Sequence, residues 1–407
     1  MRIIVIGGGL AGLSVAISLA QGGHDVEILE SAPAITYIGA GIQVSSNSSL
    51  ILRRLGIDKY IEKYCTEPVD LRMMRWKDGN LLVECPLKEP AQKEYNSPYW
   101  HIHRADLHRG LLEAALDRGC KLHLNSRVVS IDPDAGSLLT QDGTTYSADF
   151  IVASDGLHSM ARSIVLGKPG PPIPTGQMAY RVTLPAAKLR GIPELEEIIT
   201  VPRNNHWLGP HGTILSYLLE GQNEPLINFV FTCDVNEVDL PPGVDQRMGT
   251  AEEVRNSFKG WDPRIEKMLE YVEDVLYWRL YTHAPLATWS HPSHRLVLIG
   301  DAAHAMTPYL AQGAAMSIED AAILVLSLYE RLRIDRVTKV ASASVESRWF
   351  TQMEDGDKQR ERDAWLLLHP GIEPGHINLR SDKLWLDELF GYDAYQVLDE
   401  VLSEASS

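Results

Sequence analysis

Three glycines near the amino terminus have the spacing of a loop that binds the diphosphate of a dinucleotide. Gly7, Gly9 and Gly12 match G-x-G-x-x-G. The first allows a tight turn, the second lets a diphosphate approach the backbone, and the third lets a helix pack closely on a strand. Glu30 follows later, where an acid can accept hydrogen bonds from ribose hydroxyls. The chemistry indicated is the binding of a nucleotide cofactor.

The stretch around these glycines has the order that such a loop requires. "RIIVIGGGLAGLSVAISLAQGGHDVEILE" predicts a strand, a glycine turn, a helix and a second strand that ends in Glu30. The helix begins directly after the glycines, so its free N–H groups and positive dipole end face the phosphates. The pattern predicts dinucleotide binding but does not distinguish NAD from FAD.

A second group of candidate binding residues lies late in the chain, in "GDAAHAMTPYLAQGAAMSIEDAA". Asp301 is expected at the tip of the strand "RLVLI", and a helix rich in small residues is expected to begin near Gly313 and Ala314. Pro308 lies between them. A carboxylate at a strand tip beside a helix of small residues predicts room for a large, flat group.

Two further motifs complete the set. "HRADLHRGLLEAAL" places Arg104 at the start of an amphipathic helix, where the dipole disfavours a cation, so a bound anion is indicated. "ADFIVASDGLHSMAR" is a strand that ends in Asp155 and Gly156, followed by Ser159 and Arg162.

Together with "GAGIQ" (Gly39 to Gln43), these motifs resemble the single-component FAD-dependent aromatic hydroxylases, the class A flavoprotein monooxygenases, in particular their salicylate hydroxylase-like branch. The resemblance covers almost the whole chain. It implies FAD as cofactor and NAD(P)H as co-substrate. Asp301 would bind the ribityl hydroxyls, Arg104 the diphosphate, and Asp155 would serve FAD and NAD(P)H together. The cofactor-binding residues that we predict are Gly7, Gly9, Gly12, Glu30, Gly41, Gln43, Arg104, Asp155, Asp301, Gly313 and Ala314.

On the substrate side, the resemblance points to Arg181 and Tyr217 as catalytic residues. The chain departs from the family at Thr213, where a histidine is common, so acid–base chemistry would fall on Tyr217 or on water. We interpret His206 and His211 as ordinary loop histidines. His304, in "DAAH", is expected to hold its loop rather than to act in catalysis.

The expected fold is α/β, with a Rossmann-like FAD-binding domain, an inserted β-rich substrate domain and a helical C-terminus. The FAD-binding domain is predicted from residues 1–67, 101–166 and 284–370. The substrate domain is predicted from residues 68–100 and 167–283, and the C-terminal tail from 371–407. Only one dinucleotide fingerprint is present, so nicotinamide is expected to bind near the flavin.

Charge and cysteine usage exclude several classes. Lys and Arg number 38 against 54 Asp and Glu, a formal net charge of −16, whereas nucleic acids and anionic membranes favour a basic partner. The sequence has no run of 18 apolar residues, so no membrane span is predicted. The cysteines have no CxxC pair, which indicates reduced thiols, no metal site and a cytoplasmic protein. We expect a monomer or a homodimer.

The reaction implied by the resemblance is hydroxylation of a phenolic or carboxylated aromatic ring with O2 and NAD(P)H through a flavin C4a-hydroperoxide. An indole alkaloid, a polyketide phenol or a nicotinate derivative remains an alternative substrate. A flavin oxidase or dehydrogenase on the same scaffold is the alternative class. The sequence does not choose between NADH and NADPH.

Overall fold

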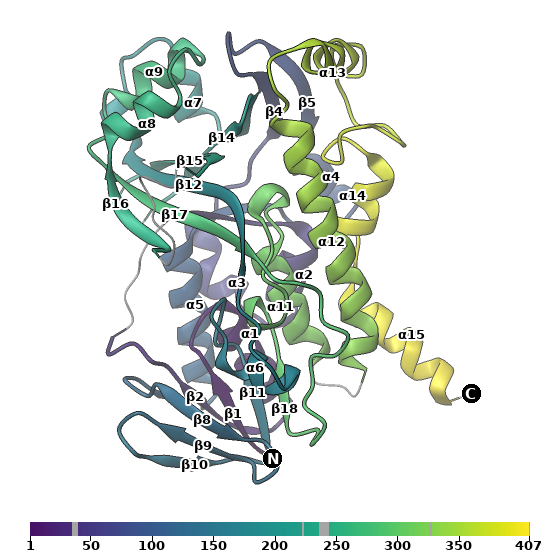
Figure 1. Cartoon of the computed structure of the whole chain (residues 1–407). Helices are drawn as coiled ribbons and strands as arrows, with labels where there is room; N and C mark the ends of the chain where they lie inside the picture. Colours follow the sequence, from purple (N-terminus) through teal and green to yellow (C-terminus); the bar gives the residue numbers. More distant parts are fainter. Residues whose placement is uncertain (35–39, 222–223, 236–243, 325–327, 407) are drawn as a thin grey trace.

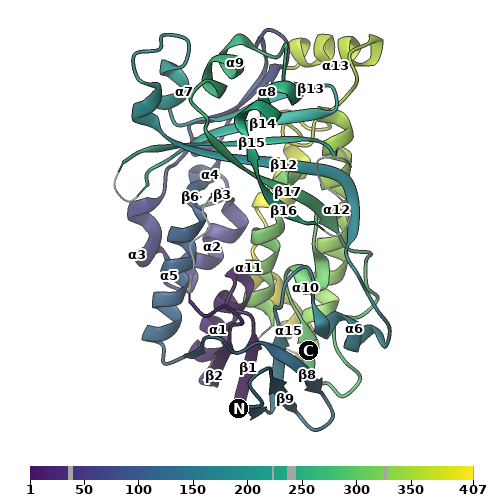
Figure 2. The same cartoon turned by 60° about the vertical axis from the view of Figure 1, so that its left-hand side comes forward.

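The computed structural model describes residues 1–34, 40–221, 224–235, 244–324 and 328–406. Gly39, in the predicted "GAGIQ" motif, lies outside these ranges. Two sheets lie toward opposite ends of the molecule, with helices between and beside them (Figures 1 and 2). No helix in the described part of the chain combines the length and the apolar character needed to cross a membrane.

The first sheet is parallel and has the nucleotide-binding topology that the N-terminal pattern predicts. All four of its strand pairs are parallel. Residues 3–6 are almost fully buried, as expected for a strand covered on both faces. In spatial order its strands are β18 (Leu296–Leu298), β11 (Phe150–Ala153), β1 (Arg2–Ile6), β2 (Asp25–Leu29) and β7 (Lys121–His123).

The second sheet has eight strands and is antiparallel except between β13 and β4. One face packs on helices α7, α8 and α9 through a hydrophobic cluster that includes Tyr180. The other face turns toward the parallel sheet (Figure 2). In spatial order its strands are β16 (Gln246–Thr250), β17 (Asp274–Thr282), β12 (Ile173–Pro185), β15 (Leu226–Asp234), β14 (Gly212–Leu219), β13 (Asn204–Gly209), β4 (Asp70–Arg75) and β5 (Leu81–Pro86).

Two small sheets complete the strands. They consist of β3 (Gly41–Val44) with β6 (Trp100–His103), and of β8 (Val128–Asp132), β9 (Ser137–Thr140) and β10 (Thr145–Ser147).

The helices fill the space between the sheets and cover their outer faces, and the long helix α12 runs beside both sheets (Figures 1 and 2). They are α1 (Leu10–Gln21), α2 (Ser46–Arg54), α3 (Asp58–Ile61), η1 (Glu62–Tyr64), α4 (Lys88–Lys93), α5 (Arg104–Asp117), α6 (Met160–Leu166), η2 (Ala186–Leu189), α7 (Glu196–Thr200), α8 (Ala251–Ser257), α9 (Pro263–Leu269), α10 (Asp301–His304), η3 (Pro308–Leu310), α11 (Gly313–Ile323), α12 (Tyr329–Thr351), α13 (Asp357–Leu368), α14 (Lys383–Phe390) and α15 (Ala394–Ser406).

The predicted α/β fold with a β-rich insertion and a helical C-terminus is confirmed. The segments 68–100 and 167–283 supply the eight strands of the large sheet, and the strands of the parallel sheet come from the other predicted segments. The domain limits themselves stay a prediction. The C-terminal segment is helical only from Lys383 onward, because residues 371–382 form turns that pack onto the body.

Candidate active site

The N-terminal glycines form the predicted turn between β1 and α1. Gly7 has φ +98°, and a side chain there would lie 2.5 Å from the carbonyl oxygen of Ser154. A side chain on Gly12 would collide with the carbonyl oxygen of Gly7. By contrast, a Cβ on Gly9 would meet no atom within 4 Å. Gly9 therefore leaves backbone open toward the start of α1, where a diphosphate would bind.

Glu30 lies beside this turn at the end of β2. Its Oε2 accepts a hydrogen bond from the Gly8 N–H at 2.8 Å, and its Oε1 accepts one from the Ala32 N–H at 2.8 Å. These bonds hold the carboxylate against the glycine loop and leave acceptor capacity on both oxygens. The position agrees with the predicted role of binding ribose hydroxyls, which stays a prediction.

Asp301 and Arg104 come from distant segments and influence each other. Neither side chain makes a hydrogen bond or ion pair within the described residues, and both are solvent-accessible. Surrounding protein nevertheless raises the pKa of Asp301 by desolvation, while His304 and Arg104 act to lower it. Desolvation likewise lowers the pKa of Arg104, while Asp301 acts to raise it. Asp301 and Arg104 can therefore be reached by solvent although protein surrounds them, as in a recess. A polar ligand that entered this recess could bind both side chains.

The Asp155 motif positions the helices around this recess. Asp155 accepts hydrogen bonds from the Ser159 hydroxyl at 2.6 Å and from the Met160 N–H at 2.9 Å, so it caps α6. Arg162 is buried and donates to the carbonyl oxygens of Ala303 and Ala284, both at 2.7 Å. Arg162 therefore links helix α6 to helix α10, which begins with Asp301. A direct contact of Asp155 with the cofactors stays a prediction.

Helix α11 begins at Gly313, as predicted, and presents its N-terminus to the same side. Gly313 and Ala314 are half-buried, and a Cβ on Gly313 would meet only Met306, at 3.9 Å. Ala311, just before the helix, has φ +56°, which costs a non-glycine residue about 1–2 kcal/mol. The first N–H groups of α11, which lack partners within the helix, therefore start directly after this strained turn and beside the space left open at Gly313.

The inner face of the large sheet carries Arg181 and Tyr217. Tyr217 pairs with Asn228, and Asn228 pairs with Thr183, so these side chains share a face with Arg181, two residues from Thr183. Burial lowers the pKa of Arg181, and Tyr217 and Arg104 are the charged or titratable neighbours that affect it further. The structure therefore brings both predicted catalytic residues to the side of the recess.

Gly41 and Gln43 lie against this face rather than in the glycine loop. A Cβ on Gly41 would lie 2.6 Å from the Tyr217 hydroxyl oxygen, so the absence of a side chain makes room for the tyrosine ring. The Gly41 N–H donates to Asn228 at 2.8 Å. Gln43 accepts a hydrogen bond from the Tyr99 hydroxyl at 2.7 Å. Their predicted contacts with the cofactor stay predictions.

His101 was missed in the sequence. It lies on β6 opposite Gln43, is fully buried, and its ring centroid is 4.3 Å from that of Tyr217. Burial lowers its pKa to about 3, so the imidazole is neutral. The sequence signal for His101 is its place in the strand-like stretch "WHIH". Side chains alternate along a strand, so His101 and His103 share the face opposite Ile102.

The interpretation of His206 as a loop histidine was wrong. His206 lies within strand β13, is 6% exposed, and shares the inner face with Tyr217. Burial, Arg380 and His101 place its pKa well below the usual value. His211 does lie in the turn between β13 and β14, where it pairs with Asp234 at 3.1 Å. The glycines around "GPHG" mark only that turn, and the strand begins earlier.

Several buried polar atoms on and beside the inner face have no protein partner among the described residues. They are Arg181 Nε, Asn204 Nδ2, Asn228 Nδ2, Gln43 Nε2 and both ring nitrogens of His101. Buried polar groups in proteins are nearly always hydrogen-bonded. Such a concentration of unused hydrogen-bonding atoms marks a surface that binds a polar ligand.

His304 has the loop-holding role that we expected, within a charged network that the sequence did not reveal. His304 Nε2 lies 2.6 Å from Asp320 Oδ2, which also accepts from the Gly300 N–H at 3.0 Å. Arg333 of α12 pairs with Asp320 at 2.9 Å and with Glu319. The network therefore joins α10, α11 and α12 directly behind the strained turn.

Comparison with known proteins identifies the family. Residues 1–348 match the family described as FAD binding domain. The chain belongs to this family. The FAD-dependent monooxygenase OpS4 of Beauveria bassiana is 34% identical, over 99% of this chain and 97% of the relative. The 6-hydroxynicotinate 3-monooxygenase of Pseudomonas fluorescens is 33% identical, over 87% of this chain and 93% of the relative.

The fold of this flavoprotein monooxygenase also matches solved structures. A salicylate hydroxylase in complex with substrate has a TM-score of 0.77 at 24% identity, covering 97% of this chain and 96% of that chain. The predicted resemblance to FAD-dependent aromatic hydroxylases is confirmed, as is FAD as the cofactor with NAD(P)H as co-substrate.

The recess of the monooxygenase fits FAD. The open backbone at Gly9 and the start of α1 suit the diphosphate, and Glu30 suits the adenosine ribose. Asp301 and Arg104 offer an acceptor and a donor without protein partners. The N-terminus of α11 would stabilise negative charge on a reduced ring.

We expect Asp301→Ala to weaken FAD retention at least about tenfold, because each charge-assisted hydrogen bond contributes roughly 1.5–3 kcal/mol. The dissociation constant can be measured by flavin fluorescence after reconstitution of the apoprotein. Asp134→Ala, at an exposed loop carboxylate, is the matched control and should retain FAD like the wild type. Equal affinity in the Asp301 variant would remove Asp301 from the cofactor site.

Proposed function

We propose that the protein hydroxylates an aromatic ring that carries a phenolic hydroxyl or a carboxylate. The observation that carries this proposal is the inner face of the large sheet, where Arg181 and Tyr217 lie among polar atoms without protein partners. The names of the relatives support it, since they include a 3-hydroxybenzoate 6-hydroxylase of Klebsiella oxytoca, 32% identical over 84% of this chain.

Of Arg181, Tyr217 and His101, the arginine is charged and the other two are neutral, and each suits a different task. Arg181 keeps its charge at any working pH and favours the phenolate form of a substrate. Burial raises the pKa of Tyr217, so its hydroxyl stays protonated and can donate a hydrogen bond to the substrate oxygen. His101 is neutral and packs on Tyr217, which fixes the direction of that hydroxyl. Arg181 is therefore the cation of this face, and His101 is a positioning residue.

The residues act on the substrate, while the cofactor supplies the redox chemistry. FAD, when bound, would supply the redox chemistry: two electrons from NAD(P)H would allow O2 to be split, with one oxygen atom entering the ring and the other leaving as water. Arg181 and Tyr217 hold the ring oxygen, and the large sheet excludes bulk water from the reacting atoms. A phenolate is the better nucleophile, so the fixed cation contributes directly to the rate.

The decisive experiment is a panel of phenols and aromatic acids scored by substrate-stimulated oxidation of NADH and of NADPH, with product analysis. We expect hydroxylated product in proportion to NAD(P)H consumed. Anaerobic stopped-flow mixing separates the alternative class, because an oxidase or dehydrogenase would be reduced by an amine or alcohol and not by NAD(P)H. Absence of flavin reduction by both nicotinamides would exclude the proposed reaction.

We also propose that the protein acts in the cytoplasm as a monomer or homodimer. The four free cysteines support a reducing compartment. Size-exclusion chromatography with light scattering would determine the oligomeric state.

A further inference from the structure

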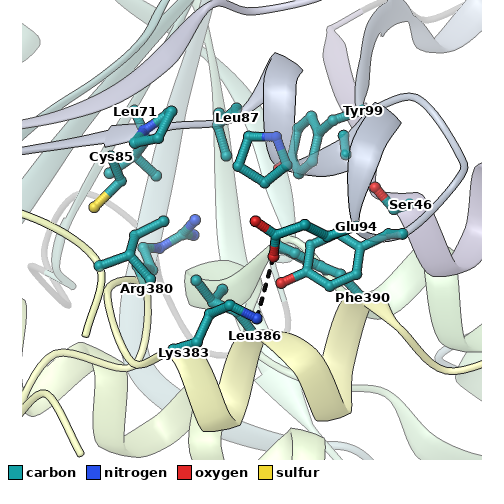
Figure 3. Close-up of a pocket in the computed structure, with 15 residues that line it drawn as sticks. Ser46, Leu71, Cys85, Leu87, Glu94, Tyr99, Arg380, Lys383, Leu386 and Phe390 are labelled. Carbon is teal, nitrogen blue, oxygen red and sulfur yellow. Dashed lines mark ion pairs between the residues drawn. The ribbon is translucent and has the colours of Figure 1, made fainter. Parts of the chain in front are cut away.

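A cavity of about 270 Å³ lies between α4, strands β4 and β5, and the C-terminal segment (Figure 3). Its walls are largely apolar and include Leu71, Leu87, Leu386 and Phe390. Pockets for small molecules begin at roughly 300 Å³, so this cavity suits a molecule at the small end of that range. None of the described residues that we assign to FAD or to the substrate ring lines it, so the cavity is separate from the active site.

Arg380 gives this apolar cavity a fixed positive charge. It lies in the turns before α14, and its half-buried side chain lines the cavity beside Cys85 (Figure 3). Its Nη2 donates to the carbonyl oxygen of Tyr309 at 2.6 Å, whereas Nε and Nη1 have no hydrogen-bond partner among the described residues. The rest of the guanidinium is therefore available to a ligand.

No negative charge among the described residues of the cavity neutralises Arg380. Burial lowers its pKa, and the titratable groups that oppose this effect are Tyr99 and Cys85. Burial raises the pKa of Tyr99 to about 12 and that of Cys85 to about 11, so both are uncharged at neutral pH. The other charges, Glu94 and Lys383, pair with each other at 3.1 Å (Figure 3). One positive charge thus remains uncompensated in apolar surroundings, which favours binding of an anion.

A second polar group of the cavity also lacks a protein partner. Ser46 lines the cavity (Figure 3) and is 1% exposed, and its hydroxyl makes no hydrogen bond within the described part of the chain. Buried polar groups in proteins are nearly always hydrogen-bonded. The unused hydroxyl of Ser46 and the unpaired guanidinium of Arg380 both indicate that a ligand with polar atoms occupies this apolar space.

Tyr99 forms a wall that the cavity shares with the inner face of the large sheet. Tyr99 lines the cavity, whereas its hydroxyl donates to Gln43 at 2.7 Å and its ring meets that of His101 at a centroid distance of 6.0 Å. Neither Gln43 nor His101 lines the cavity. Across this wall the two sites are electrostatic neighbours, because Arg380 affects the pKa of His206 on the inner face.

We propose that the cavity is a second binding site, separate from those of FAD and the substrate ring, for a small carboxylic acid with an apolar body. The carboxylate pairs with Arg380, and the body lies against the leucine side chains of the walls. Hydrogen bonds between a guanidinium and a carboxylate are stronger than those between neutral groups. The inference goes beyond the proposed function, because this ligand carries no ring and is not hydroxylated.

The test measures the binding of straight-chain acids to the FAD-loaded protein by calorimetry. From acetate to hexanoate, affinity should rise about fourfold for each added CH2 group, the factor that corresponds to burial of one such group. Hexanoate should bind about tenfold or more tightly than hexanamide, the factor given by one charge-assisted hydrogen bond. Equal affinity of acetate and hexanoate, or of hexanoate and hexanamide, would overturn the proposal.

Three variants assign the charge effect to Arg380. Arg380→Gln should abolish the preference for hexanoate and leave hexanamide binding unchanged. Arg380→Lys keeps the charge and should retain most of the preference, which shows that loss in the glutamine variant is not misfolding. Lys383→Gln removes the cation that is already paired with Glu94 and should leave the preference intact. A preference that persists in Arg380→Gln would place the carboxylate elsewhere.

A fourth variant shows whether the cavity and the substrate face are separate sites. Arg181 lies on the inner face and does not line the cavity, so Arg181→Gln should bind hexanoate as tightly as the wild type. Loss of hexanoate binding in this variant would mean that the acid occupies the substrate face, and the second site would be refuted. The result does not depend on the proposed reaction, because binding is measured without NAD(P)H and without an aromatic substrate.

Discussion

Replacing Arg333 with methionine is expected to destabilise the protein by about 3–5 kcal/mol, the cost of leaving a buried charge without its partner. Arg333 is fully buried between Glu319 and Asp320. Methionine fills similar space but provides no charge. Glu319 would keep Arg336, at 2.8 Å, whereas Asp320 would keep only His304 and one backbone N–H. The free energy of unfolding can be measured by urea denaturation of the FAD-loaded protein.

The matched control is Lys339→Met on the same helix. Lys339 pairs with Glu388 at an exposed position, and exposed pairs contribute about 0–1 kcal/mol. An Arg333 variant no less stable than the Lys339 variant would show that the network is dispensable.

The network also predicts a pH dependence. Burial acts to raise the pKa of Asp320, but His304, Arg333 and hydrogen bonds outweigh it and hold the pKa at about 2. An unfolded aspartate titrates near 3.9. Because the folded pKa is the lower one, the stabilisation is present above about pH 4 and is lost as the pH falls toward 2. In Arg333→Met the pKa of Asp320 should lie closer to its unfolded value, so the stability lost between about pH 4 and pH 2 should be smaller than in the wild type.

The cofactor side could be predicted from sequence because its requirements are local. The geometry of a single turn requires Gly7, Gly9 and Gly12, and Asp301 lies shortly after the end of strand β18. Such motifs fix backbone shape within a few residues.

The residues that were missed depend on contacts between distant segments. His101 becomes a neighbour of Tyr217 only when the β3–β6 hairpin meets the large sheet. Arg380 reaches Tyr309 from the C-terminal turns, and Arg333 reaches α11 from α12. No spacing along the chain shows these pairs. The parallel pairing of β13 with β4 was equally hidden, because the two strands belong to segments separated by the FAD-binding residues.

Arg181→Gln is expected to separate flavin reduction from hydroxylation. Arg181 lies on the inner face of the large sheet, where its Nε has no partner among the described residues and its guanidinium carbon lies 5.0 Å from the ring centre of Trp278. Glutamine can still donate a hydrogen bond, but it carries no positive charge to stabilise a phenolate. NAD(P)H should still reduce FAD, because the cofactor residues are unchanged.

The yield of hydroxylated product per NAD(P)H should fall on the order of 10²-fold, the effect of removing one preorganised electrostatic contact, with a matching rise in H2O2. Bound phenol should titrate at higher pH than in the wild type, since the lost cation no longer favours its anion. Both quantities can be measured, by peroxide assay with product analysis and by absorbance titration of a bound phenol.

Two variants test whether the positive charge of Arg181 is responsible for the coupling of NAD(P)H oxidation to hydroxylation. Arg181→Lys keeps a cation and should recover part of the coupling. Arg72→Gln, on β4 of the same sheet, removes an arginine that pairs with Glu84 at 2.6 Å on the other face and should couple like the wild type. If Arg181→Gln instead forms product as efficiently as the wild type, the phenolate must be stabilised by another group. Arg380 would then be a candidate, because it affects the pKa of His206 on this face and has no carboxylate partner among the described residues.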